Sequence, residues 1–267
     1  MIGTKYILKN QQWQVPEFYH LEFFKKRSDV CVCIPVINEG ERIKNLLTKM
    51  GSLSNEIDVI IADGGSTDGS LKNEFLHGAG VRTLLIKNGP GKLSAQMRMG
   101  MSYAIEQGYS GIISIDGNNK DDPSAIPNFL NKLKEGYDFI QGSRHIPGGQ
   151  GINTPFIRHL AIKYLHAPLI SLAARYRYTD TTNGFRAYST KFLLDDRVQP
   201  FRDVFWSYEI LFYLAVCAAR LGFRVTEIPT IRAYPKATKV PTKISPLRGN
   251  IKLLKILFRT LFIGYYP

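Results

Sequence analysis

The sequence predicts an α/β fold with a doubly wound, mostly parallel sheet. Apolar runs of strand length alternate with helical patterns from residue 30 onward, which is the order of strands and crossover helices in such a sheet. Polar and acidic residues follow each run, at the strand ends where open α/β sheets bind ligands. With 267 residues and 44% hydrophobic content, the chain is long enough to bury a large core.

The elements are expected in regular order. The predicted strands are Val30–Ile37, Asp58–Ala62, Arg82–Ile86 and Ile112–Ile115. Helical spacing after the first strand turns Ile43, Leu46 and Leu47 inward, and after the third strand it does the same for Met97, Met101 and Ala104.

Two flanking segments differ from the sheet domain, which is expected to cover residues 29–235. Residues 1–28 are aromatic and basic and predict a short helical arm outside the sheet. Residues 236–267 predict a basic amphipathic tail. Basic residues recur at helical spacing in it, at Arg248, Lys252, Lys255 and Arg259. The adjoining face is apolar and consists of Leu247, Ile251, Leu254, Phe258 and Leu261, widened by Leu253, Ile256 and Leu257. Such a helix suits the headgroup region of an anionic bilayer, although a helix packed on the core has the same pattern.

The fourth strand delivers a cluster of polar side chains to its carboxyl end: Asp116, Asn118, Asp121 and Asp122. Carboxylates held this close repel one another unless a cation or a bound donor offsets them, so the cluster indicates a divalent-metal or polyhydroxyl site. The competing interpretation is an acidic turn that caps the helix starting at Pro123 and Ser124.

Acids also follow the first and second strands. Glu39 comes after the first, and Asp63 opens the loop Asp63-Gly64-Gly65-Ser66-Thr67-Asp68 after the second. Because the carboxyl ends of parallel strands meet at one edge, Glu39, Asp63 and Asp116 are expected to converge on one crevice.

Composition and missing motifs exclude several classes. A dinucleotide-binding GxGxxG loop should follow the first strand, but Asn38-Glu39-Gly40 stands there, and no Walker A loop is present. The net charge of +13 and the pI near 9.6 predict an anionic partner. Nucleic acid is disfavoured as that partner, because the basic residues lie mainly near the carboxyl end, beside aliphatic residues and without a stacking platform.

The motifs, taken in order, resemble family 2 glycosyltransferases with a GT-A fold. The nearest branch contains the dolichyl-phosphate mannose synthases and bacterial polyprenyl-phosphate glycosyltransferases. The matching segments are Pro35-Val36-Ile37-Asn38-Glu39, Asp63 to Asp68, Asn88-Gly89 with Ala95, Asp116-Gly117-Asn118, Gly142-Ser143-Arg144 with Arg158, Asp180 to Arg186, Tyr208-Glu209 and Glu227-Ile228-Pro229.

The resemblance implies roles for these residues. The nucleotide-sugar donor would be held by Pro35, Asn38, Glu39, Asp63, Gly65, Lys92, Asp116, Gly117 and Asn118. The phosphate of a polyprenyl-phosphate acceptor would be held by Ser143, Arg144 and Arg158, and the residues implied in catalysis are Asp116, Asp180, Arg144 and Arg158. An arginine fork suits phosphate because it stays charged and binds two oxygens at once.

The metal motif departs from the family pattern. Asp116 and Asn118 would bind Mg²⁺ or Mn²⁺, but Asn118 stands where the family has a second Asp, and Lys120 where the mannose synthases have a metal-contacting Gln. Either Asp121 or Asp122 supplies the missing charge, or the Lys120 ammonium partly replaces the metal. A neutral amide is a weak ligand for a hard cation, so weak metal dependence is expected.

The acceptor decides whether a general base is needed. A polyprenyl phosphate is already ionised, and no histidine of this chain lies in an acid/base pattern. The alternative is a family 2 enzyme that extends a lipid-linked, O-antigen or capsular glycan by attack of a sugar hydroxyl, for which Asp180 would be the base.

Location is expected to be cytoplasmic and peripheral, on the inner membrane face or on a membrane-embedded partner. The first residues carry Lys5, Lys9 and Glu17 rather than a signal peptide, and no apolar run reaches the length of a membrane span. Cys31, Cys33 and Cys217 form neither a disulfide framework nor a zinc set and are expected to be buried thiols.

Overall fold

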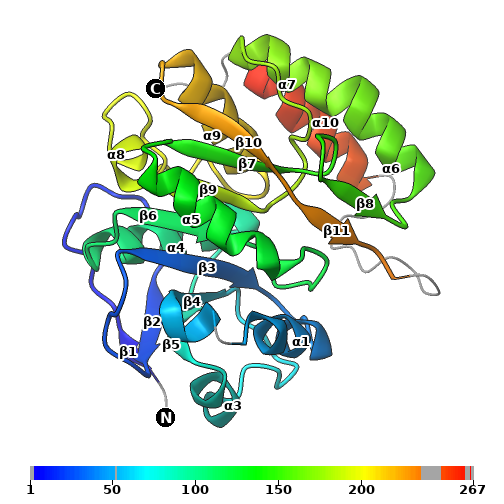
Figure 1. Cartoon of the computed structure of the whole chain (residues 1–267). Coiled ribbons are helices and arrows are strands. Elements are labelled where there is room, and N and C mark those ends of the chain that lie inside the picture. Colours follow the sequence, from blue (N-terminus) through cyan, green and yellow to red (C-terminus); the bar gives the residue numbers. More distant parts are fainter. Residues whose placement is uncertain (1–2, 52, 236–247, 262–264, 266–267) are drawn as a thin grey trace.

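A large central sheet organises the molecule. The computed structural model describes residues 3–51, 53–235, 248–261 and 265, and it describes the side chains of these residues except 54, 55, 248–253 and 261. Within this part of the chain nine strands form one sheet, in the order β1-β2-β5-β4-β3-β6-β9-β7-β10 (Figure 1). Their bounds are Thr4–Lys5 (β1), Phe18–Glu22 (β2), Val30–Val36 (β3), Asp58–Asp63 (β4), Val81–Lys87 (β5), Gly111–Ser114 (β6), Phe139–Ser143 (β7), Arg186–Ser189 (β9) and Val225–Pro229 (β10).

The middle of this sheet is parallel. Strands β5, β4, β3 and β6 run in the same direction, whereas β9 is antiparallel to both of its neighbours, β6 and β7. A small second sheet pairs β8 (Gln150–Ile152) with β11 (Ile231–Ala233) in parallel register. The carboxyl ends of β3, β4 and β6 therefore meet at one edge, as the sequence predicts.

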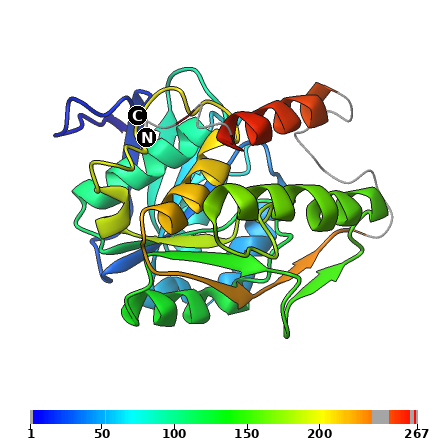
Figure 2. The ribbon, with the colours of Figure 1, turned by 90° about the horizontal axis from the view of Figure 1, so that it is seen from above.

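Helices cover both faces of the sheet (Figures 1 and 2). Their bounds are Glu41–Met50 (α1), Leu53–Glu56 (α2), Asn73–Gly78 (α3), Leu93–Glu106 (α4), Pro123–Ala125 (η1), Ile126–Lys134 (α5), Phe156–Ala161 (α6), Ile162–His166 (η2), Ala167–Ala174 (α7), Thr190–Leu193 (α8), Glu209–Arg220 (α9) and Arg248–Leu261 (α10). One apolar cluster packs α1, α3 and α5 on one face, and the other packs α4, α7, α9 and α10 on the opposite face.

The predicted α/β architecture is confirmed, and each of the four predicted strands lies within about one residue of its observed bounds. Helix α4 approaches β3 so closely that a Cβ at Gly100 would collide with the Cys33 sulfur. The three cysteines are buried and free, as expected. No helix within the described residues has both the length and the apolar character needed to cross a bilayer.

The expected helical arm at residues 1–28 is wrong. Its β2 segment pairs antiparallel with β5 and extends the main sheet, and β1 pairs with β2 in turn. Phe18 is 1% exposed and stacks on Tyr6 with ring centroids 5.0 Å apart. Aromatic residues favour strands where they pack on a half-buried sheet, so the composition that suggested an arm fits an added strand.

The carboxyl-terminal helix is partly a core element. Within α10, Ile256 and Leu257 are buried against α7 and α9, so the prediction that they widen a membrane-facing surface is wrong. Lys255 and Arg259 are exposed, and Phe258 is 47% exposed. Residues 236–247 of the predicted tail lie outside the described residues.

Replacing Phe18 with Ala tests whether β2 is part of the core. We expect the Phe18→Ala change to lower the free energy of unfolding by about 3 kcal/mol or more, because it removes a buried ring and leaves a cavity. Ile7 is 77% exposed, and Ile7→Ala should change the stability by under about 0.5 kcal/mol. Urea denaturation of both variants measures the difference, and equal effects would mean that the segment is not packed.

Candidate active site

Hydrogen bonds join the loops that follow β3 and β4. The Asn38 N–H donates to the Ser66 hydroxyl at 3.0 Å, and the Asn38 side-chain oxygen accepts from the Thr67 N–H at 2.8 Å. Asn38 has a φ of 48°, a left-handed conformation that asparagine tolerates better than most residues. The predicted donor-binding loops thus form one structure.

Gln96 on α4 links the carboxyl ends of β3 and β4. Its buried side-chain amide on α4 donates to the carbonyl oxygens of Val36 at 2.7 Å and Ala62 at 3.0 Å. Gln96 is not among the residues predicted from the sequence. The sequence pattern that could have indicated it is a polar residue on the buried face of a predicted helix.

Asp63 ends β4 and points into its own loop. Its carboxylate accepts from the Ser66 hydroxyl at 2.6 Å and from the Ser66 N–H at 2.9 Å. Burial raises the pKa of Asp63, and the Ser66 hydrogen bonds oppose that rise. Gly65 follows with a φ of 95°, which favours glycine, and no atom lies near the position of an added Cβ. The loop therefore has an open face beside a buried carboxylate.

The other predicted donor-binding residues surround this edge. Glu39 pairs with Arg42 at 2.7 Å. Pro35 lies at the end of β3 and receives the Gly117 N–H on its carbonyl oxygen at 3.3 Å. Lys92 is exposed just before α4, where its N–H donates to the Trp206 carbonyl oxygen at 2.8 Å. Glu39, Asp63 and Asp116 therefore follow strands that end at one edge of the sheet, and their convergence on one crevice stays a prediction.

Asp116 is paired with Arg232, which was not predicted from the sequence. One of its carboxylate oxygens accepts from Arg232 at 3.0 Å and from the Asn118 amide at 3.2 Å. Arg232 also pairs with Asp121, which is fully buried. Burial raises the pKa of Asp121, and the positive charge of Arg232 opposes that rise.

The side chain of Tyr234 lies among four cationic groups. The Arg158 guanidinium donates to its hydroxyl at 3.3 Å, and Arg144 approaches the hydroxyl at 3.5 Å. The ring centroid lies 5.2 Å from the Lys120 ammonium and 5.9 Å from the Arg232 guanidinium. Burial acts to raise the pKa of Tyr234, but the charges of the three arginines hold it below its ordinary value. Such a density of positive charge suits phosphate groups.

Tyr234 could have been found from the sequence. It lies two residues after Arg232, and strand geometry places alternate residues on one face. Both are buried, while Ala233 between them is exposed. The pattern that could have indicated Tyr234 is this alternation in the short segment after the Glu227-Ile228-Pro229 motif.

Arg144 and Asp180 form a buried bidentate ion pair. Their atoms meet at 2.6 Å (Nε to Oδ2) and 2.9 Å (Nη2 to Oδ1), and both side chains are almost fully buried. Burial acts to raise the pKa of Asp180, but the charge and hydrogen bonds of Arg144 outweigh it, so this pKa lies below its usual value. Asp180 therefore orients Arg144 and is a poor proton acceptor.

Ser143 does not face the Arg158 and Tyr234 group. It is buried, its hydroxyl lies 2.6 Å from that of Thr179, and it accepts from the His145 N–H at 3.0 Å. Ser143 therefore fixes the loop that carries Arg144.

The predicted metal ligands have few oxygen atoms to offer. Asn118 accepts from the Lys120 N–H at 3.2 Å, Asp121 is buried against Arg232, and Asp122 caps η1 by accepting from the Ser124 N–H at 3.0 Å. Among the described residues no group of three or more His, Cys, Asp and Glu side chains could hold a metal ion. The side chains near Asp116 therefore do not fit a divalent-metal site built by the protein.

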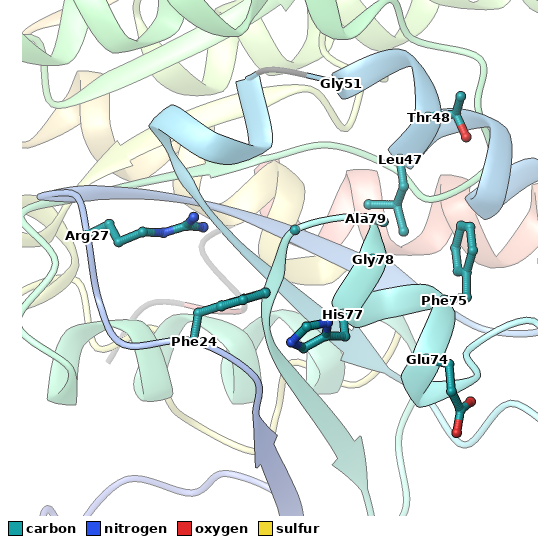
Figure 3. A pocket seen from close by; sticks show the side chains of 11 residues that line it. Phe24, Arg27, Leu47, Thr48, Gly51, Glu74, Phe75, His77, Gly78 and Ala79 are labelled. Carbon is teal, nitrogen blue, oxygen red and sulfur yellow. The ribbon is translucent and has the colours of Figure 1, made fainter.

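Two cavities lie at opposite ends of the sheet strands. One of about 260 Å³ is lined by Arg42, Asn118, Asn119, Lys120, Ala233, Tyr234 and Pro235, and so belongs to the candidate site. Another of about 750 Å³ lies at the amino ends of β3 and β5, where Phe24 stacks on His77 at 4.7 Å (Figure 3). That end is opposite to the ligand-binding edge of an α/β sheet.

Comparison with known proteins identifies the family. A family model described as glycosyl transferase family 2 matches residues 31–197, more than half of the chain. The chain belongs to glycosyl transferase family 2. It is therefore a nucleotide-sugar-dependent glycosyltransferase, and the resemblance found from its motifs is confirmed.

Individual family 2 relatives are distant. Glycosyltransferase AglJ of Haloferax volcanii is 27% identical over 237 residues, covering 86% of this chain and 71% of the relative. The undecaprenyl-phosphate mannosyltransferase of Micrococcus luteus is 26% identical over 203 residues, covering 75% and 82%.

A solved structure confirms the GT-A fold. Glucosyl-3-phosphoglycerate synthase from Mycobacterium tuberculosis, crystallised with Mn²⁺, UDP and glucosyl-3-phosphoglycerate, superposes with a TM-score of 0.59 at 13% identity, covering 88% of this chain and 78% of that one.

Removing the Asp180 charge tests the buried pair. We expect Asp180→Asn to lower the free energy of unfolding at pH 7 by about 3 kcal/mol or more, because Arg144 is left buried without its partner. The folded protein holds the pKa of Asp180 below its usual value of 3.8. The stabilisation is thus complete above about pH 4 and is lost as the pH falls through the folded-state pKa.

Urea denaturation between pH 3 and pH 7 measures this dependence. The stability difference between the wild type and Asp180→Asn should shrink at the acid end. Asp196→Asn is the control, because the Asp196 side chain is exposed and lies outside the site. A difference that stays constant with pH would contradict the assignment.

Proposed function

We propose that this family 2 enzyme transfers a sugar from a nucleotide-sugar donor to a polyprenyl phosphate, with inversion, at the cytoplasmic face of a membrane. The observation that carries the proposal is the group of cations around Tyr234. Arg158 comes from α6, and Arg232 also pairs with Asp116. The name of the Micrococcus luteus relative supports the same class of acceptor.

The donor side of the site would be the edge formed by β3, β4 and β6. Asp63 and the open Gly65 loop suit the base and ribose, whose N–H and hydroxyl groups need acceptors. The diphosphate would face the cavity lined by Lys120 and Tyr234, where positive charge is concentrated. Stabilising the leaving diphosphate is the main electrostatic task of the reaction.

The acceptor side would be formed by Arg158 and the Tyr234 hydroxyl. A phosphate oxygen of the lipid attacks the anomeric carbon, the bond from that carbon to the donor diphosphate breaks, and its electron pair leaves with the nucleoside diphosphate. Arg144, which is held by Asp180, approaches the same hydroxyl at 3.5 Å. Attack from the face opposite to the leaving group inverts the anomeric centre.

The alternative acceptor, a sugar hydroxyl, needs a general base. Asp180 was the candidate, but both of its oxygens accept from Arg144 and its pKa is lowered. A carboxylate committed in this way accepts a proton poorly. This favours a phosphate acceptor, which is ionised before it binds.

The surface next to Arg158 supports contact with a lipid. Helices α6 and α7, joined by the π-helical turn η2, form one long segment along the side of the molecule (Figure 2). This segment exposes Phe156 (73%), Ile157 (81%), Tyr164 (67%) and Leu172 (74%). Large apolar side chains gathered on one surface indicate an interaction site. Helix α10 packs beside α7 and adds the exposed Phe258, Lys255 and Arg259.

Mg²⁺ or Mn²⁺ is the cofactor that the sequence predicts. Asp116 and Asn118 remain the residues that would bind it, but one carboxylate oxygen of Asp116 accepts from Arg232 and the amide oxygen of Asn118 accepts from the Lys120 N–H. We therefore assign no step to a metal ion and propose that its requirement is weak.

Transfer of label to lipid tests the proposed reaction. Protein is incubated with a radiolabelled nucleotide sugar and undecaprenyl or dolichyl phosphate, and the product is extracted into organic solvent. We expect label in the organic phase, reduced roughly tenfold to hundredfold in Arg158→Gln through loss of a charge-assisted contact to phosphate.

The control is Arg197→Gln, which removes a cation that is 59% exposed and pairs only at the surface. Its transfer rate should equal that of the wild type. Label found only on an added oligosaccharide would contradict the lipid acceptor and support the hydroxyl alternative.

Sedimentation with phosphatidylglycerol vesicles tests the proposed membrane surface. The triple variant Phe156→Ser, Ile157→Ser and Leu172→Ser should bind roughly a hundredfold more weakly than the wild type, because three apolar side chains no longer insert among the lipids. Leu194, which is 49% exposed after α8, provides the control Leu194→Ser. Equal sedimentation of wild type and triple variant would refute this surface.

A further inference from the structure

Arg232 occupies the centre of the acidic motif. Its side chain is 8% exposed and comes from β11, whereas its carboxylate partners Asp116 and Asp121 follow β6. One guanidinium nitrogen lies 3.0 Å from Asp116, and the other pairs with Asp121 and lies 3.3 Å from the Asn183 amide oxygen. The guanidinium is therefore held in place by three acceptors.

These contacts engage two of the oxygens that a divalent ion could use, Asp116 Oδ2 and Asn118 Oδ1. The Asp116 oxygen that faces Arg232 also receives the Asn118 amide, and the Asn118 oxygen receives the Lys120 N–H. An arginine cannot be displaced from this position without leaving Asp121 buried and unpaired, at a high free-energy cost. The positive charge at this motif thus belongs to the chain itself.

Lys120 brings a second positive charge to the same place. It is 6% exposed, lies in the segment between Asp116 and Asp121, and lines the cavity of about 260 Å³. Its ammonium and the Arg232 guanidinium lie 5.2 Å and 5.9 Å from the centroid of the same Tyr234 ring. Lys120 and Arg42 are thus the cationic residues that line the cavity, whereas Arg232 is not among its lining residues.

The two cations balance the two carboxylates of the motif. Without them Asp116 and Asp121 would repel an incoming diphosphate, and a bound dication would have to offset that repulsion. With the two acids offset by Arg232 and Lys120 together, the diphosphate meets a site that no longer repels it.

We propose that Arg232 and Lys120 are the resident cations of the donor site and neutralise the leaving diphosphate in place of a divalent metal ion. Arg232 is the positioning residue, which pairs with both acids and fixes the loop, and Lys120 is the group that contacts the diphosphate. The proposal rests on the proposed function, because it takes the diphosphate of a nucleotide sugar as the ligand of this cavity.

Binding of nucleoside diphosphates measured by calorimetry tests the proposal without requiring turnover. UDP, GDP and CDP are titrated into EDTA-treated protein, and the one that binds is then titrated again with Mn²⁺ present. We expect the two dissociation constants of the wild type to agree within about threefold, since the fixed cations supply the charge in both conditions.

The informative variant is Asp121→Asn combined with Arg232→Gln, which removes both members of the buried pair and leaves only the partly exposed Asp116 without its partner. Its affinity in EDTA should fall roughly tenfold to hundredfold, and Mn²⁺ should restore part of it, because the freed Asp116 can then bind the ion. Lys120→Gln, which keeps the Arg232–Asp121 pair, should show the same loss in EDTA if the double variant does not fold. Arg197→Gln should bind like the wild type.

The outcomes separate the two proposals. Nucleotide binding that requires Mn²⁺ in the wild type, or that is unchanged in EDTA in both the double variant and Lys120→Gln, overturns the resident cations and leaves the proposed function intact. Failure of all three nucleotides to bind in either condition overturns the proposed function, and this inference with it.

Discussion

Two buried arginines hold the acidic groups of the site in place. Arg144 pairs with Asp180, and Arg232 pairs with Asp116 and Asp121. Removing charges from water is costly, and only close, well-directed pairing offsets that cost. Each pair also joins separate parts of the chain: Arg144 follows β7, Asp180 precedes β9, and Arg232 on β11 reaches back to the end of β6. The charges therefore fix the relative positions of the loops on which the site is built.

The part of the site that the sequence predicted depends on local pattern and sheet geometry. Buried strands are short apolar runs, and parallel strands place their carboxyl ends together, so the predicted convergence of Glu39, Asp63 and Asp116 followed from the order of the elements. Arg158 was assigned from the resemblance alone, and its contact with Tyr234 agrees with a place in the site. Family membership could also be predicted, because the motifs occur in a fixed order along the chain.

The remaining features depend on contacts between residues far apart in the sequence. Nothing around Asp121 indicates that a partner 111 positions later will bury it. Phe18 shows the same limit, since an aromatic segment packs equally well as a helix or as an added strand until its neighbour β5 is known. In α10 the helical period was right, but only the packing against α7 and α9 shows that Ile256 and Leu257 face the core.

The charge arrangement also accounts for a departure within the motif itself. A carboxylate at position 118 would be the third beside Asp116 and Asp121, and three negative charges would exceed the two positive charges of Arg232 and Lys120. Asn118 avoids this, because its amide donates to Asp116 at 3.2 Å while its oxygen accepts from the Lys120 N–H. The replacement of an acid by an amide, the Lys at position 120 and the Arg at position 232 thus act in the same direction. Together they make the motif less negative, which is the change required if the chain itself is to supply the positive charge for a diphosphate.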